Sequence, residues 1–216
     1  MNKQKISLIV YDFDGTLVDT LFDIADAVNL SLKELGLRTL DRETIRKYVG
    51  KGVERLMAQS IDDTDCTDLS LAVELFRKNY SKNLMNHTRF YPFGREILDH
   101  FHDKKQAICS NKPEDFVRRI LESLKSLDRF DAILGGDSVK SKKPDPEGLL
   151  HLLDRFQCSP EMAVLVGDSP VDIETGKRAG VYTCVVTFGF GDATEIASAG
   201  PDCSIDNLLE LKNLLY

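Results

Sequence analysis

The sequence predicts an α/β fold in which a doubly wound, Rossmann-like parallel sheet is interrupted by an inserted helical domain. Two observations support this prediction. Short apolar runs alternate with amphipathic stretches along most of the chain, and one long early stretch shows helical patterning alone. Alternating strands and helices favour a parallel sheet with right-handed crossovers. The reactive cleft of such a sheet lies beyond the carboxyl ends of its strands.

Five apolar runs are typical of strands buried on both faces, because each is compact, rich in Ile, Val or Leu, and followed by turn residues. In chain order they are Ile6–Tyr11, Gln106–Cys109, the weaker Ala132–Leu134, Met162–Val166 and Thr183–Thr187. Between them we expect helices over Glu114–Leu124, Pro146–Phe156 and Pro170–Ala179. Proline is well tolerated in the first turn of a helix, where its missing N–H costs nothing.

The stretch from Val18 to Asn86 contains no strand candidate. Apolar residues recur there at helical spacing between Leu21 and Leu35, and Gly36 ends that helix. Further helices are expected near Arg42–Tyr48, Val53–Ser60 and Leu69–Leu84. We therefore predict a helical domain over residues 17–86, inserted into an α/β core formed by residues 1–16 and 87–216.

Composition narrows the classes of partner. The 216 residues are 42% hydrophobic and 29% charged, which is typical of a soluble globular protein. A net charge of −7 argues against non-specific binding to nucleic acid. The N-terminus is too short for a signal peptide, and no run approaches the ~18 apolar residues of a membrane helix. The five cysteines are scattered and lack a Cys-x-x-Cys pair. We expect a cytoplasmic protein without nucleic-acid or membrane partners, either a monomer or a homodimer.

Polar and charged side chains follow the predicted strands. They are Asp12, Asp14, Gly15 and Thr16 after the first run, Ser110, Asn111 and Lys112 after the second, Lys142 and Lys143 after the third, and Asp168 and Asp172 after the fourth. Because the carboxyl ends of parallel strands meet at one edge of a sheet, these side chains should converge. Three carboxylates from two strands together with a lysine are more than turns and helix caps require.

The chemistry follows from charge. Asp12, Asp14 and Asp168 would repel one another without a cation, and their hard oxygen ligands suit Mg²⁺. Magnesium also lets an anionic carboxylate approach an anionic phosphate ester. Asp12 is then suited to be the nucleophile that forms an aspartyl-phosphate. Asp14 can protonate the leaving oxygen, because residues two apart in an extended strand face the same side.

These residues resemble the motifs of the haloacid dehalogenase superfamily of phosphotransferases. The superfamily pattern is D-x-D-G-T after the first strand, Ser or Thr after the second, a later Lys, and G-D-x-x-x-D near the end. The resemblance implies that Asp12 is the nucleophile and Asp14 the acid/base, that Ser110 binds the phosphoryl group, and that Lys143 steadies the charge. It also implies a metal held by Asp12, Asp168 and the backbone carbonyl of Asp14, beneath a helical cap. The superfamily lysine directly precedes Pro, which favours Lys143 over Lys142.

Two subfamilies do not match the first motif. Dehalogenases lack the second acid, which Asp14 supplies here, and P-type ATPases carry Thr at that position. Further stretches resemble the phosphoglycolate phosphatase branch, although that branch more often has Thr where this chain has Ser110. They are Tyr48–Val53, Ser110–Pro113, Gly135–Asp137, Lys143–Glu147, Gly167–Ser169 and Thr187–Gly191. The resemblance implies a magnesium-dependent phosphomonoesterase acting on a small phosphorylated metabolite, with 2-phosphoglycolate as the expected substrate. The expected substrate-binding residues are Gly15, Thr16, Asn111 and Lys51.

Several alternatives stay open at the level of sequence. Lys51 could meet a substrate carboxylate or simply lie at a helix start, and a Schiff base on it would make a phosphonoacetaldehyde hydrolase. A sugar-phosphate mutase shares the same core. A response-regulator-like signalling module also uses clustered Asp, Mg²⁺ and Lys-Pro, but it would be shorter and would lack the helical insertion. Asp172 either orients the lysine or a metal-bound water, or serves as a first-turn helix acid.

Overall fold

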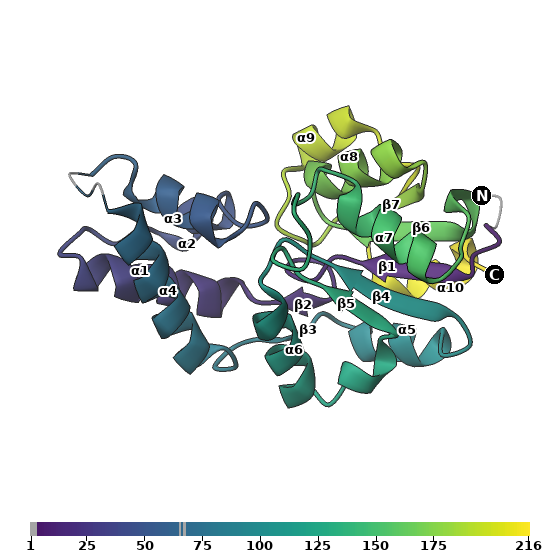
Figure 1. Ribbon diagram of the computed structural model, residues 1–216, viewed down its shortest axis with the longest axis horizontal. Coiled ribbons are helices and arrows are strands. Elements are labelled where there is room, and N and C mark those ends of the chain that lie inside the picture. Colours follow the sequence, from purple (N-terminus) through teal and green to yellow (C-terminus); the bar gives the residue numbers. More distant parts are fainter. Residues whose placement is uncertain (1–3, 65, 67) are drawn as a thin grey trace.

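The computed structural model describes residues 4–64, 66 and 68–216. Two parts are visible in Figure 1: a sheet covered by helices on both faces, and a group of four helices beyond one end of it. The C-terminus lies at the end of the sheet that is far from the four helices, and Gln4, the first described residue, forms a β-bridge with Leu215 beside it.

The sheet has six strands in the order β5-β4-β1-β6-β7-β8, and every neighbouring pair is parallel. The strands are β1 (Leu8–Tyr11), β4 (Lys105–Cys109), β5 (Ala132–Leu134), β6 (Ala163–Gly167), β7 (Tyr182–Val186) and β8 (Cys203–Ile205). The register places Tyr11 opposite Ile108 of β4 and Val166 of β6. The residues that follow these strands therefore start at one level of the sheet. This arrangement confirms the predicted α/β fold class.

Helices cover both faces of the sheet because the strands are apolar on both faces. The helices of the α/β part are α5 (Gly94–His100), α6 (Glu114–Ser123), α7 (Glu147–Arg155), α8 (Pro170–Ala179), α9 (Ala193–Ala199) and α10 (Leu211–Leu214). Ile9 and Tyr11 of β1 belong to the buried cluster that includes α5, α6 and α10, whereas Leu8 and Val10 belong to the cluster that includes α7. Side chains of one strand alternate between two cores, as the pleat requires.

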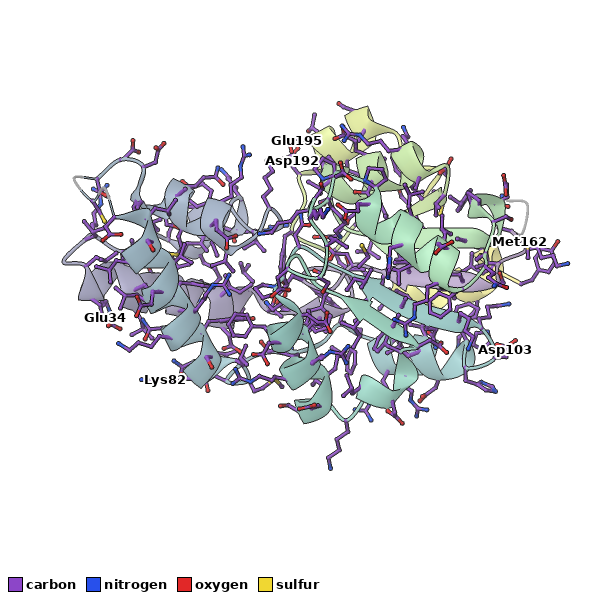
Figure 2. The ribbon with its side chains drawn as sticks, viewed as in Figure 1. Glu34, Lys82, Asp103, Met162, Asp192 and Glu195 are labelled. Carbon is purple, nitrogen blue, oxygen red and sulfur yellow. The ribbon has the colours of Figure 1, made fainter. Side chains whose placement is uncertain are left out.

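Short segments and caps complete this part. The 3₁₀ turns are Leu127–Arg129, Pro160–Met162 and Leu208–Glu210. Asp192 caps α9 by accepting hydrogen bonds from the backbone N–H groups of Thr194 and Glu195 (Figure 2). Such a cap satisfies donors that have no partner inside the helix.

The four separate helices are α1 (Leu21–Glu34), α2 (Arg42–Arg46), α3 (Val53–Ile61) and α4 (Leu69–Asn83). Helix α1 packs along α4, with Val28 and Leu32 on one side and Phe76 and Tyr80 on the other, all buried. Their helical spacing puts these side chains on one face of each helix. At the far end of the two helices, Glu34 of α1 forms an ion pair with Lys78 of α4 (Figure 2).

One expectation about this region is wrong. Val18–Asp19 forms a strand, β2, which pairs antiparallel with β3 (Arg89–Phe90). Two residues are too short to show an alternating pattern, and their pairing depends on a partner about seventy positions away along the chain. The β2–β3 ribbon joins the two chain segments that lead into and out of the helices.

Two smaller expectations concern cysteines and membrane spans. All five cysteines are free. Within the described residues, no helix combines the length and apolar character needed to cross a bilayer.

Candidate active site

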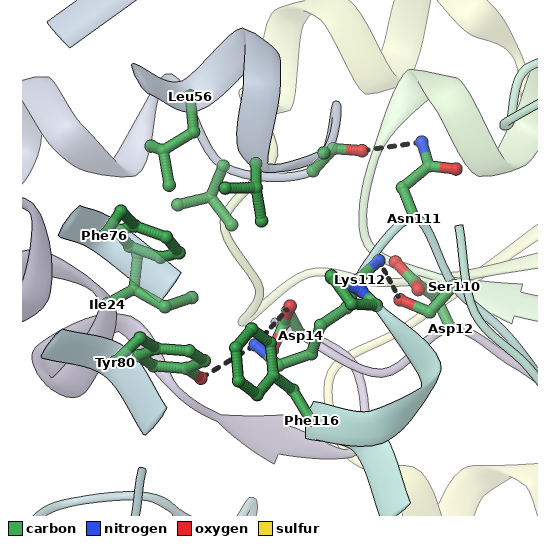
Figure 3. Close-up of a pocket in the computed structure, with 15 residues that line it drawn as sticks. Asp12, Asp14, Ile24, Leu56, Phe76, Tyr80, Ser110, Asn111, Lys112 and Phe116 are labelled. Carbon is green, nitrogen blue, oxygen red and sulfur yellow. Dashed lines mark hydrogen bonds and ion pairs between the residues drawn. The ribbon is translucent and has the colours of Figure 1, made fainter. Parts of the chain in front are cut away.

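A pocket opens between the carboxyl ends of the central strands and the four separate helices (Figure 3). The α/β part contributes Asp12, Asp14, Ser110, Asn111, Lys112, Pro113 and Phe116 to its lining. The helical part contributes Ile24, Val49, Gly50, Gly52, Val53, Leu56, Phe76 and Tyr80. One side of the pocket is therefore polar and charged, and the opposite side is almost entirely apolar.

Asp12 lies at the floor of the pocket and is 7% exposed. The ammonium of Lys143 lies 3.0 Å from its Oδ1. This ion pair is not aligned as a hydrogen bond, so within the described residues Oδ1 has no hydrogen-bond partner. Burial raises the pKa of Asp12 to about 6, although Lys143 and the Ser110 hydroxyl act to lower it. A carboxylate oxygen has two lone pairs, so Oδ1 can accept a cation in addition to its ion pair with Lys143.

Lys143 is held by a second acid. Its Nζ donates to Oδ1 of Asp172 at 2.6 Å, and both side chains are buried. Burial acts to lower the pKa of Lys143, but the attraction of Asp12 and Asp172 outweighs this effect and the pKa is raised. Oδ2 of Asp172 also accepts from the backbone N–H and the hydroxyl of Ser169, which caps α8.

Asp168 is the third acid of the cluster. Oxygens of Asp12, Asp168 and Asp172 lie within 4.8 Å of one another, and all three residues are buried. Burial raises the pKa of Asp168 well above its usual value, and the charges of Asp172 and Asp12 add to the effect. Three acids therefore face a single lysine, so the cluster carries an excess of negative charge that suits a divalent cation.

Two residues of the first motif lie against the Asp168 carboxylate. The Thr16 hydroxyl donates to its Oδ1 at 3.3 Å. Gly15 has φ +83°, and a Cβ there would collide with the Asp168 carboxylate. The backbone N–H of Phe190 donates to Oδ2 at 2.6 Å. Gly15 and Thr16, expected as substrate-binding residues, thus contact Asp168 and lie outside the pocket lining.

The carboxylate of Asp14 turns toward other partners. It accepts from the hydroxyl of Thr20 at 2.6 Å and from Nζ of Lys112 at 3.0 and 3.1 Å. Asp12 and Asp14 both line the pocket, as expected for neighbours two positions apart. Only Asp12 joins the acidic cluster through its side chain.

Ser110 and Asn111 follow β4 and line the pocket beside Asp12. The carboxamide of Asn111 donates to the backbone carbonyls of Gly50 and Lys143, both at 2.9 Å, and accepts from the N–H of Lys143. Asn111 therefore connects three segments: the end of β4, the loop that carries Lys143, and the loop before α3.

The neighbouring lysines Lys142 and Lys143 differ in their partners and in their burial. Lys142 forms an exposed ion pair with Glu54 of α3 at 2.7 Å, whereas Lys143 is buried beside Asp12. Lys51 is exposed and lies outside the pocket lining, although its neighbours Gly50 and Gly52 belong to it.

Sequence reasoning placed Lys112 among the converging strand-end residues without giving it a role, and it missed Tyr80 of the pocket. Nζ of Lys112 donates to the Tyr80 hydroxyl at 2.7 Å as well as to Asp14. Burial lowers the pKa of Lys112, and Asp14 partly offsets this shift. The position of Lys112 directly after Ser110 and Asn111 predicts its place at the strand ends but not its partners. Tyr80 gave no signal, because an aromatic residue on an amphipathic helix indicates core packing.

Comparisons with known proteins agree with this geometry. A family model described as haloacid dehalogenase-like hydrolase matches residues 9–186. The chain is 37% identical to a phosphoglycolate phosphatase of Nitrosospira multiformis, over 97% of this chain and 96% of that one. It is also 37% identical to a phosphoglycolate phosphatase of Aquifex aeolicus, over 96% of both chains. The crystal structure of a predicted phosphoglycolate phosphatase from Haemophilus somnus superposes with a TM-score of 0.94 at 28% identity, covering 98% of this chain and 99% of that chain.

Proposed function

The chain belongs to the haloacid dehalogenase-like hydrolases, and from this premise we propose that it is a magnesium-dependent phosphomonoesterase whose best substrate is 2-phosphoglycolate. The observation that carries the proposal is the position of Asp12. This buried acid lies beside Lys143 and lines a pocket to which both parts of the chain contribute residues. Full-length similarity to phosphoglycolate phosphatases supports the substrate.

The residues present fit a magnesium ion. Oδ1 of Asp12 lacks a hydrogen bond within the described residues, and the three acids of the cluster outnumber its one lysine. Asp12, Asp168 and the backbone carbonyl of Asp14 would hold the ion. Asp172 would stay paired with Lys143. Bound there, magnesium would neutralise phosphoryl oxygens as the nucleophile approaches.

The chemistry then belongs to side chains of the chain itself. A carboxylate oxygen of Asp12 attacks phosphorus, the P–O ester bond breaks, and an aspartyl-phosphate forms. Asp14, protonated when the substrate binds, gives its proton to the leaving oxygen. Its carboxylate then takes a proton from water, the water oxygen attacks phosphorus, and the bond from Asp12 to phosphorus breaks, which releases phosphate and restores Asp12. Lys143 offsets the negative charge on Asp12 and the phosphoryl group, and Ser110 donates to a phosphoryl oxygen.

We further propose that residues 17–86 act as a cap over a core formed by residues 1–16 and 87–216. The hydrogen bond from Asn111 to the carbonyl of Gly50 supports this division, since it joins the two parts at the pocket. A cap that closes on the substrate excludes water from the phosphoryl group until the leaving group has departed.

The alternative chemistries find less support. A mutase must hold a second phosphate, yet Lys112 is the one cation among the pocket-lining residues of the described chain. A Schiff base needs a lysine inside the pocket, and Lys51 lies exposed outside its lining. Neither observation favours a function other than ester hydrolysis.

The test is a phosphate-release screen over small phosphoesters with Mg²⁺, using wild type and Asp12→Asn. We expect 2-phosphoglycolate to give the highest kcat/KM and Asp12→Asn to be inactive. Activity that survives in Asp12→Asn, or after complete removal of Mg²⁺, would contradict the mechanism. Transfer of phosphate to a sugar without net release would indicate a mutase.

A further inference from the structure

Lys112 has no part in the mechanism above, yet it occupies a central place in the pocket (Figure 3). It is 7% exposed, and among the described residues that line the pocket it is the one with a cationic side chain. A buried ammonium is costly unless it has anionic or polar partners. Asp14 and the Tyr80 hydroxyl supply those partners.

The Tyr80 ring of α4 packs against aromatic rings from both parts of the chain. It stacks on Phe76 with centroids 5.4 Å apart and meets Phe116 edge-on at 5.1 Å. The hydroxyl accepts a hydrogen bond from Lys112, so its own O–H is free to donate to another group. Two donors, the Lys112 ammonium and the Tyr80 hydroxyl, thus lie together where the polar and the apolar linings of the pocket meet.

We propose that Lys112 determines substrate specificity by binding a carboxylate located one methylene from the phosphoester oxygen, with the Tyr80 hydroxyl as second donor. This inference rests on the proposed function and names the residue that selects the substrate. Charge-assisted hydrogen bonds from an ammonium to a carboxylate are among the stronger ones in proteins.

The position of Asp14 sets the reach of Lys112. Asp14 is the group that meets the leaving oxygen, and Nζ of Lys112 lies one hydrogen-bond length from Asp14. A carboxylate separated from that oxygen by one carbon therefore comes within range of the ammonium. A longer or bulkier leaving group would extend against Ile24, Phe76 and Phe116 and would leave its polar groups without partners.

The experiment compares kcat/KM for 2-phosphoglycolate with kcat/KM for ethyl phosphate, which has the same carbon count and no carboxylate. Because Lys112 also pairs with Asp14, Lys112→Met will lower both rates, and the ratio isolates the carboxylate contact. We expect the ratio to fall about 10- to 100-fold in Lys112→Met. Lys142→Met is the matched control: it removes a nearby lysine that binds Glu54 outside the pocket and should leave the ratio at its wild-type value.

An unchanged ratio in folded Lys112→Met would overturn the inference while leaving the phosphatase intact. Wild type that hydrolyses neither ester would overturn the proposed function itself. Should Lys112→Met fail to fold, Tyr80→Phe removes a single hydroxyl and should lower the ratio about 2- to 10-fold. A wild-type ratio in Tyr80→Phe would then count against the inference.

Discussion

Nζ of Lys143 donates a 2.6 Å hydrogen bond to Oδ1 of Asp172 while lying 3.0 Å from the carboxylate of Asp12. The other oxygen of Asp172 caps α8 through Ser169. Both interpretations that the sequence left open for Asp172 are therefore present in one side chain. It is a first-turn helix acid, and it holds the lysine beside Asp12.

Asp172→Asn separates these two roles. We expect kcat to fall about 10- to 100-fold, because Lys143 loses an anionic partner and its position beside Asp12 is less well fixed. Stability should also fall by about 1–3 kcal/mol. Steady-state kinetics and thermal unfolding measure the two effects.

Ser169→Ala is the control for the capping role, because it removes the hydroxyl that binds Asp172 and leaves Lys143–Asp172 in place. It should cost about 1 kcal/mol of stability with a much smaller loss of kcat. If Asp172→Asn turned over substrate as fast as Ser169→Ala, the lysine-holding role would be refuted.

Asp12→Asn should abolish turnover, by at least about 10³-fold, and yet stabilise the metal-free protein. The pKa of Asp12 is raised from 3.8 to about 6 by burial, so its ionised form destabilises the folded state above pH 6. That destabilisation fades as the pH falls through 6 toward the ordinary value. The stability advantage of Asp12→Asn in EDTA should therefore shrink between pH 7 and pH 5, as measured by thermal unfolding.

Asp14→Asn is the matched substitution, and we expect it to lower the stability that Asp12→Asn raises. It is the same chemical change two residues away, but it deprives buried Lys112 of its anionic partner. We expect it to lower the unfolding midpoint at pH 7. A rise in the midpoint for Asp14→Asn would mean that the Lys112–Asp14 pair does not stabilise the fold.

Magnesium should stabilise the wild-type protein through Asp168. A ligand at about 100 times its Kd adds about 2.7 kcal/mol to the free energy of unfolding. For a chain of this size, that corresponds to about 5–10 °C in Tm. Asp168→Asn should lose most of this shift, whereas Asp154→Asn, an exposed acid on α7, should keep it. Equal shifts in the two variants would place the ion elsewhere.

The parts of the fold that could be predicted from sequence are those with a continuous local signal. Strands β1, β4 and β6 lie within one or two residues of their expected limits, because each is apolar on both faces and ends in polar residues. Strands β2 and β3 have two residues each, too few to show a pattern. The three residues of β5 are all apolar and were predicted, whereas the three residues of β8 have a serine at their centre. The existence of β2, β3 and β8 depends on partners distant in the chain.

The same limit applies to the site. Asp12, Ser110 and Asp168 follow parallel strands, so the register of the sheet brings them together. Lys112 and Tyr80 come together only because α4 packs against the start of α6, a tertiary relationship that no local pattern encodes. The environment of Lys51 likewise depends on how the loop before α3 lies over the pocket.

That loop is tied down by Asn111, whose carboxamide makes three hydrogen bonds of 2.9 Å to the backbone of Gly50 and Lys143. Asn111→Ala removes all three, and we expect a stability loss of about 2–3 kcal/mol. The kcat/KM should fall about 10- to 100-fold, because both the loop before α3 and the loop that carries Lys143 lose a shared anchor.

The distinguishing measurement is amide hydrogen exchange over residues 49–53. Exchange there should become faster in Asn111→Ala, since the loop is then held to the core by fewer contacts. Asn83→Ala is the control: its carboxamide donates to the carbonyl of Asn79 within α4 and accepts from Asn86, so the substitution should leave that exchange at the wild-type rate. If loop exchange stayed slow in Asn111→Ala while activity fell, Asn111 would act through Lys143 alone. The contact with Gly50 would then contribute nothing to activity.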